Sequence, residues 1–382
     1  RKRGLGIFGT GMHHDPLSSS RKLKIFHWGH DWVDLCIIIV RPWWAPGKVF
    51  ALPICMRLYR NRQGLTKGKN KNKSPTKARL TKQATKKCRQ AAIAKKKAAA
   101  KQRAVHANHK KPHKTRPELM AEMVALVAWW FPDRKLLLLV DSLYSGKSVL
   151  SKLPANVELI GPVHPKAALY EVAPDEQPDR RGPRCKKGKR LPDREAWKND
   201  RKKWQTVRFD QYGLHGTLRI KSRTGLYYKA GKDRKLRFVL SDDTVGDRPT
   251  RIFYCTDLSL KPREILSLFS LRWSIEVTHY NCKQHLGLED PANRTPKAVD
   301  RTAPMSMFLY SLTIVWFATE GHKHLEYAYR PWYPHKSEPS FADMLTTLRR
   351  KSWEDQLPKV SRPPTHDDNS IGLLTWLTSL AG

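Results

Sequence analysis

The chain has 382 residues, with 73 Lys and Arg against 34 Asp and Glu and a formal net charge of +39. This excess predicts a polyanionic partner, nucleic acid first and an anionic membrane surface second. No apolar run reaches the ~18 residues of a membrane span; the longest, 308–318, has the length of a buried helix. The six cysteines form no C-x-x-C pair, which argues against a zinc ribbon or a disulfide framework and favours a reducing cytoplasm.

The first 60 residues predict β-structure. Residues 23–26, 32–41 and 49–59 are rich in β-branched and aromatic side chains, and Pro42 and Pro46 separate the last two runs. Such runs between turn signals are typical of strands. We expect a three-stranded antiparallel meander at the edge of a sheet.

A strongly basic segment follows at residues 66–117, with nineteen Lys and Arg and no Asp or Glu. One interpretation is a solvated linker, because a segment of this charge cannot bury enough apolar surface to fold alone. The other is an arm that neutralises DNA phosphates. The two interpretations are compatible.

The next segment predicts a helix and then a strand that ends in an acid. Residues 115–130 carry apolar side chains at helical spacing, and the apolar run 135–140 leads to Asp141. The triplet 146–148, Gly-Lys-Ser, matches the end of a phosphate-binding P-loop, but Asp141 occupies the position of the first P-loop glycine. A carboxylate there would repel phosphate, whereas a strand that delivers a carboxylate is a common element of metal sites. A further short strand is predicted at 157–163.

Residues 174–258 predict a basic loop and then a β-rich insertion. The loop covers 174–192, and alternating apolar and polar residues with turn signals follow it. The expected strands are 204–209, 216–221, 227–228, 236–241 and 251–256.

Residues 261–290 have the apolar spacing of a helix. Arg272, Glu276 and Lys283 would project from roughly one face of it. Taken alone, this geometry is that of a surface ion pair with a nearby lysine.

The sequence around these three residues is more informative than their geometry alone. It reads RW-x-IE and then K-x-x-LGLED, and it resembles the Tyr-x2-Arg-x3-Glu-x6-Lys signature of the DDE transposases of bacterial insertion sequences. Phe269 stands at the tyrosine position, which removes one hydroxyl contact to DNA. Asp141, followed by Tyr144, resembles the second catalytic motif of that family, and the segments GHDWVDL, ALPICMRLY and RRGPRCKKGKRLP resemble further family sequence.

The resemblance implies an α/β fold, an RNase H-like mixed sheet flanked by helices, with the β-rich insertion between the second Asp and the Glu and a helical C-terminal part. It implies that Asp141 and Glu276 are catalytic and hold Mg²⁺ or Mn²⁺ in a two-metal site. The residues expected to contact DNA are Arg272, Lys283, Tyr280 and Phe269.

The resemblance places the first catalytic acid on the first core strand, ahead of Arg1, so that the chain is expected to be N-terminally truncated. Within the chain, Asp15, Asp31 and Asp34 are the possible substitutes. Asp15 follows two histidines but precedes a turn signal, and the other two lie in the predicted strand 32–41 or just before it.

We therefore expect a transposase that cleaves and transfers DNA strands of an insertion sequence in a metal-dependent reaction. It would bind terminal repeats and target DNA as a homodimer, in the bacterial cytoplasm at the nucleoid and without a membrane. The alternatives are a catalytically dead remnant and a non-enzymatic basic nucleic-acid-binding protein. The expected parts are the start of the core at 1–65, the basic arm at 66–117, the continued core at 118–173, the insertion at 174–258, the core helices at 259–325 and a helical tail at 326–382.

Overall fold

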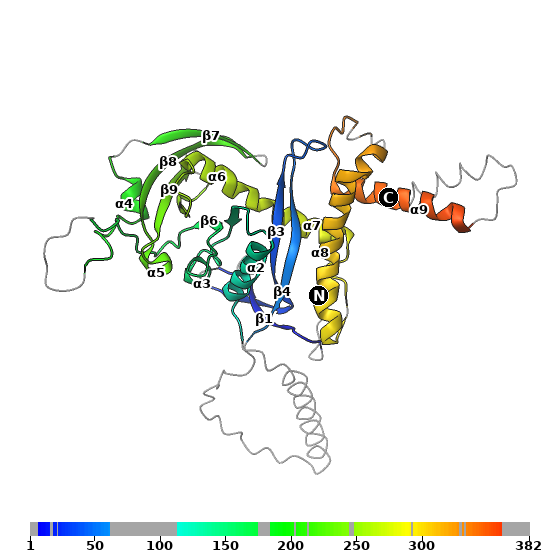
Figure 1. Cartoon of the computed structure of the whole chain (residues 1–382), viewed down its shortest axis with the longest axis horizontal. Helices are drawn as coiled ribbons and strands as arrows, with labels where there is room; N and C mark the ends of the chain where they lie inside the picture. The colour runs from blue at the N-terminus through cyan, green and yellow to red at the C-terminus, as the bar shows by residue number, and fades with distance from the viewer. Residues whose placement is uncertain are drawn as a thin grey trace, which may run out of the picture. The chain divides into compact units, whose positions relative to one another are not determined.

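The computed structural model describes residues 7–15, 18–20, 22–61, 113–174, 184–201, 204–211, 214–243, 248–291, 293–327, 331 and 334–360. Most of the basic arm therefore lies outside the described residues. The chain divides into two compact units, and Figure 1 shows its helices and strands. The first unit comprises Arg1–Val33, Arg57–Thr115 and Leu288–Met305, and the second comprises Asp34–Met56, Arg116–Gly287 and Ser306–Gly382.

The first unit contains a hairpin of β1 (Gly11–Asp15) and β2 (Ile25–Gly29), paired antiparallel. Asp15 ends β1, and its carboxylate accepts hydrogen bonds from the backbone N–H and the hydroxyl of Ser18. The expected three-stranded meander is wrong, because β2 pairs back with β1 and the next two strands form a separate pair. Residues 11–15 carry no strong strand signal, because His13, His14 and Asp15 hide the alternation.

The second pair consists of β3 (Asp31–Val40) and β4 (Val49–Tyr59). Residues from the far end of the sequence hold the turn between them. The backbone N–H of Gly47 donates to Glu338 Oε1 at 2.5 Å, and Lys48 Nζ donates to the carbonyl oxygen of Pro339 at 2.8 Å. Two long helices, α8 (Pro296–Thr319) and α9 (Phe341–Val360), complete the C-terminal part.

The main sheet has six strands in the order β5-β6-β10-β9-β8-β7. The strands are β5 (Leu136–Leu139), β6 (Val157–Pro162), β7 (Gln205–Gln211), β8 (Leu214–Leu226), β9 (Lys235–Asp243) and β10 (Arg251–Cys255). The β5–β6 pair is parallel and the other pairs are antiparallel. This mixed sheet with its helices is compatible with the RNase H-like class. The strands expected in the insertion continue the sheet that carries β5.

Two short helices, α3 and α5, connect strands of the main sheet. Helix α3 (Lys147–Leu150) begins directly after Gly146 and lies between β5 and β6. The strand predicted at Tyr227–Tyr228 is wrong. Tyr228 begins the short helix α5 (Tyr228–Gly231) instead, because β8 continues to Leu226 and the chain must then turn toward β9.

The remaining helices include those that carry the candidate site. They are α2 (Arg116–Trp130), α4 (Arg194–Lys198), α6 (Pro262–Ser270), the 3₁₀ turn η1 (Leu271–Trp273), α7 (Ser274–His285) and the 3₁₀ turn η2 (Gly321–His324). The helix expected over 261–290 is thus divided by η1. Pro262 suits the first turn of α6, where its missing N–H needs no partner.

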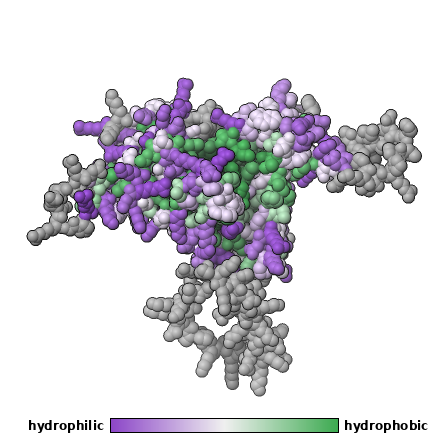
Figure 2. All heavy atoms as spheres, viewed as in Figure 1, coloured by the Kyte–Doolittle hydropathy of each residue, from purple (hydrophilic) through white to green (hydrophobic). Residues whose placement is uncertain are grey.

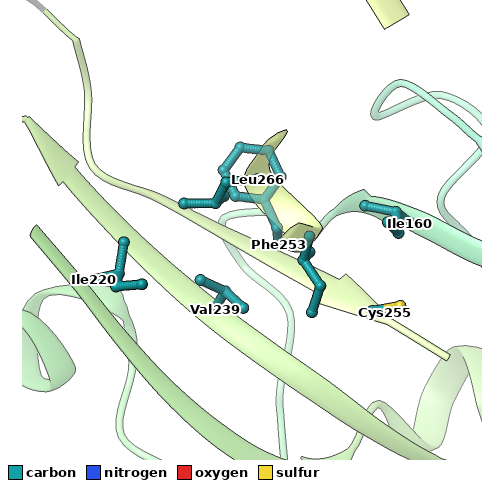
Figure 3. Close-up of a cluster of buried hydrophobic side chains, with 7 residues drawn as sticks. Ile160, Ile220, Val239, Phe253, Cys255 and Leu266 are labelled. Atoms are coloured by element: carbon teal, nitrogen blue, oxygen red, sulfur yellow. The ribbon is translucent and has the colours of Figure 1, made fainter. Parts of the chain in front are cut away.

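One buried apolar cluster of the second unit lies between the sheet and α6 (Figure 3). Ile160, Val239 and Cys255, from three neighbouring strands, are fully buried. Ile265 and Leu266 of α6 pack against them, so the apolar side of this helix is fixed on the sheet. Burial of each such side chain contributes about 1.5–3 kcal/mol.

Among the described residues, α8 is the one helix that is long and apolar enough to cross a bilayer, by length and composition only. In the most apolar 18-residue stretch of α8, 44% is buried inside the protein. Core helices of soluble proteins can be equally long and apolar. One such helix is weak support for a span. Ser311 in this helix donates a hydrogen bond from Oγ to the carbonyl oxygen of Pro53 at 2.9 Å, so α8 contacts β4.

Candidate active site

Asp141 lies two residues beyond the end of β5. Its Oδ1 accepts a hydrogen bond from the backbone N–H of Leu143 at 2.8 Å, and the carbonyl oxygen of Asp141 accepts one from the N–H of Tyr144 at 3.2 Å. These bonds close a tight turn that fixes the carboxylate at the end of the strand. Tyr144 lies beside it in the lining of the same cavity.

Glu276 lies in the first turn of α7, and its side chain is 49% exposed. Arg272, in η1, places Nη1 at 3.6 Å from Oε1 of Glu276. The Arg272 guanidinium also lies 6.0 Å from the centre of the Phe269 ring. Phe269 itself packs on the core with its ring centre 4.7 Å from that of Phe253.

A buried hydrogen bond holds the inner side of α7 in the second unit. Thr278 is fully buried, and its Oγ1 donates to the carbonyl oxygen of Ala51 on β4 at 2.7 Å. Trp273, Val277 and Tyr280 are exposed on the opposite side of the helix. The Glu276 carboxylate is therefore carried by a helix with a fixed inner side and an open outer side.

His279 and Asp34 form a further pair at α7. His279 Nε2 lies 2.9 Å from Asp34 Oδ2 on β3. Burial by itself would lower the pKa of His279, but the hydrogen bond to Asp34 and the charges of Asp34 and Glu276 outweigh burial, so the pKa is raised above its ordinary value. The pair links β3 to α7 one helical turn beyond Glu276.

These side chains line one cavity of about 510 Å³ within the second unit. Asp34, Asp141, Arg272, Glu276 and His279 all belong to its lining. The structure thus brings together two predicted site residues, Asp141 and Glu276, that are far apart in the sequence. It adds Asp34, one of the three possible substitutes for the first acid.

The other sequence candidates lie elsewhere. Tyr280 is 63% exposed, and Lys283 is exposed in the last turn of α7. Neither side chain lines the cavity. Asp15 and Asp31 belong to the first unit, where they pair with histidines.

Two carboxylates at one cavity can supply some of the ligands of a divalent cation. Oxygen ligands are those that Mg²⁺ prefers, and it usually needs only one or two protein carboxylates beside water and substrate oxygens. Asp141 and Glu276 could supply these ligands. Among the residues that the structure describes, no three His, Cys, Asp or Glu side chains form a group that could hold a metal ion, and Asp34 is already engaged by His279.

Sequence reasoning missed the pairing of Asp34 with His279 and the exposure of Trp273. The Asp34 signal was present, since this acid lies in the GHDWVDL segment that matched the family. Its partner could not be identified, because 245 residues separate the two. Trp273 in η1 is exposed, and no signal in the sequence distinguishes it from a core aromatic.

Comparison with known proteins agrees with this geometry. The family model of the transposase DDE domain matches residues 104–308, which is more than half of the chain. The match includes Asp141, Glu276 and the helices that carry the signature. Among curated proteins, none matches the chain. The chain belongs to the family of transposases with a DDE domain.

Proposed function

We propose that this transposase cleaves and joins DNA strands of an insertion sequence in a reaction that depends on a divalent metal ion. One observation carries the proposal: Asp141, after a strand, and Glu276, on a helix, line the same cavity. The alternative of a purely DNA-binding protein would require basic residues but gives no reason for two acids to converge.

Asp141 and Glu276 are the residues proposed to hold Mg²⁺ or Mn²⁺. A pair of such ions activates the attacking water or 3′-hydroxyl and stabilises the leaving oxygen. The protein's own contribution is to fix the two carboxylates: the turn at Asp141 holds one, and the buried contact of Thr278 holds the helix of the other.

Arg272, Lys283 and Tyr280 are proposed to contact DNA. Arg272 borders the cavity, so its guanidinium can bind a phosphate beside Glu276, as charge-assisted hydrogen bonds to phosphate favour. Exposed Tyr280 offers a ring on which a base can stack. Phe269 is also proposed to contact DNA; its ring packs against Phe253 and lies 6.0 Å from the Arg272 guanidinium. Terminal repeats and target DNA are the proposed ligands, bound by a homodimer at the bacterial nucleoid.

The metal part is tested by Mn²⁺ binding, measured by electron paramagnetic resonance on the full chain. Asp141→Asn and Glu276→Gln keep the side-chain shape and remove the charge, so each should weaken Mn²⁺ binding at least tenfold. Asp233→Asn, at an exposed turn position, is the matched control and should change nothing. Unchanged Mn²⁺ affinity in both site variants would overturn the proposal.

The DNA part is tested separately by binding to terminal-repeat DNA. Arg272→Ala or Lys283→Ala should cost more affinity than removal of one lysine from the segment 66–114, because a fixed residue is not interchangeable with its neighbours. Equal losses would show that the two residues act only as surface charges.

A further inference from the structure

The C-terminal half of α8 has an apolar side that is open to solvent. Four of its side chains are between 43% and 52% exposed: Phe308, Leu309, Leu312 and Val315. They recur at positions i, i+1, i+4 and i+7, so they form one stripe along the helix, the α8 stripe. All four belong to the second unit. In Figure 2, apolar side chains gather around β3 and β4 and the part of α8 beside them.

The opposite side of the same part of α8 is buried. Tyr310, Ile314 and Phe317 are at most 1% exposed, and residues 306–319 contain no charged side chain. A surface helix normally carries charged and polar side chains on its outer side, whereas a helix that is apolar all round is covered on every side. The α8 stripe is therefore incompletely covered by the described part of the chain.

A second apolar stripe is encoded in residues 370–382, SIGLLTWLTSLAG, which lie outside the described residues. This segment contains no charged residue, although 28% of the chain is charged. Leu373, Leu377 and Leu380 recur at i, i+4 and i+7, a spacing that also occurs in the α8 stripe. Asn369, directly before the segment, is a favoured N-cap residue. The pattern predicts a short helix with one apolar side.

Such a helix needs a surface to pack on, because isolated helices of this length are marginal in water. The α8 stripe is within its reach. Helix α9 begins on α8, where the ring centres of Phe341 and Tyr310 are 4.6 Å apart. The 20 residues of α9 correspond to a helix about 30 Å long. The linker 361–369 can span about 30 Å when extended, so the segment can return along α9 to α8.

We propose that residues 370–382 form a helix whose leucine side packs on the α8 stripe of the same chain. The short linker keeps the segment close to α8, and a tethered contact is favoured over the same contact with a second copy. The packing would cover both apolar stripes and leave the side of Thr375 and Ser379 in water. The proposal is independent of the proposed function, because it uses neither the acids nor DNA.

Hydroxyl-radical footprinting with mass spectrometry tests the contact, because it measures how fast each exposed side chain is oxidised. The full 382-residue chain is compared with a variant that ends at Asn369. Oxidation of Phe308, Leu309 and Leu312 should be at least threefold faster without the segment. Trp129 on α2 is 75% exposed and serves as the internal control, which should react equally in both proteins.

Two double variants test which side of the segment makes the contact. Leu377→Asp with Leu380→Asp places charges on the apolar side and should speed oxidation of the α8 stripe as much as removal of the segment does. Thr375→Asp with Ser379→Asp is the matched control, because these positions lie on the opposite side of a helix. The control pair should leave oxidation unchanged, and equal effects of the two pairs would overturn the proposed packing.

The proposal is also overturned if removal of residues 370–382 leaves oxidation of the α8 stripe unchanged. Light scattering separates the same chain from a second copy. A doubling of the molar mass that disappears with the segment would show that it covers α8 of another copy, which would overturn the contact within one chain. Co-sedimentation with phosphatidylcholine vesicles that is lost in the Leu377→Asp, Leu380→Asp variant would assign the segment to a lipid surface and overturn the proposal as well.

Discussion

Asp242 is a buried carboxylate in β9, only 3% exposed. It accepts hydrogen bonds from Lys198 Nζ at 2.8 Å, Arg219 Nη2 at 2.5 Å and Thr250 Oγ1 at 2.6 Å. Burial by itself would raise the pKa of Asp242, but the three donors outweigh it and lower the pKa from 3.8 to about 2. The ionised form is therefore favoured by folding.

Replacement of Asp242 by Asn should destabilise the second unit by about 2 kcal/mol at pH 7, because each unit of pKa shift corresponds to about 1.4 kcal/mol. A lowered pKa gives stability that is present above the unfolded value near 3.8 and is lost as pH falls through about 2. The difference between wild type and Asp242→Asn should therefore shrink between pH 4 and pH 2. Urea denaturation at a series of pH values measures it. Asp233→Asn is the control, and a difference that persists at pH 2 would contradict the mechanism.

At the scale of single elements, α7 depends on one buried hydroxyl. Thr278→Val keeps the β-branched shape but leaves the carbonyl oxygen of Ala51 without this donor. The expected loss is about 1–3 kcal/mol, the usual cost of an unsatisfied buried group. Chemical denaturation measures it. In the control Thr319→Val, an exposed hydroxyl that bonds only within its own helix is removed, and equal losses in the two variants would show that the contact between α7 and β4 contributes nothing.

The elements also show how much the sequence could predict. Patterns within single segments predicted α2, β5, β6 and the helix of Glu276. The apolar spacing and the turn residues that mark these elements lie within the elements themselves or next to them. They did not give the pairing of β2 with β1 or the placement of β5 at the edge of its sheet. Pairing depends on contacts between distant segments, which a single pattern does not contain. The same holds for the site: the motif spacing identified Asp141 and Glu276, whereas the partner of His279 depends on a strand that precedes it by more than 200 residues.

For the whole molecule, the basic segment 66–114 should dominate the salt dependence of DNA binding. It carries eighteen of the 73 Lys and Arg, and its deletion would lower the formal net charge from +39 to +21. For every phosphate that the deletion variant no longer neutralises, the slope of log affinity against log salt should fall by about 0.9. Titrations at several salt concentrations, with the full chain and the deletion variant, measure the slope. A charge-neutral replacement by a Gly/Ser segment of equal length separates charge from spacing, and an unchanged slope would show that the segment does not bind phosphates.

The bonds that Gly47 and Lys48 make with Glu338 and Pro339 also set a time for folding on the ribosome. The two ends of these bonds lie 291 residues apart. At a synthesis rate of about 5–20 residues per second, roughly 15 to 60 seconds separate the emergence of the β3–β4 turn from that of its partners. During this interval the nascent chain presents an incomplete ribbon with apolar strands, a typical substrate for chaperones. The product of a transcript cut short before the codon for Glu338 would lack the residues that hold the β3–β4 turn from outside.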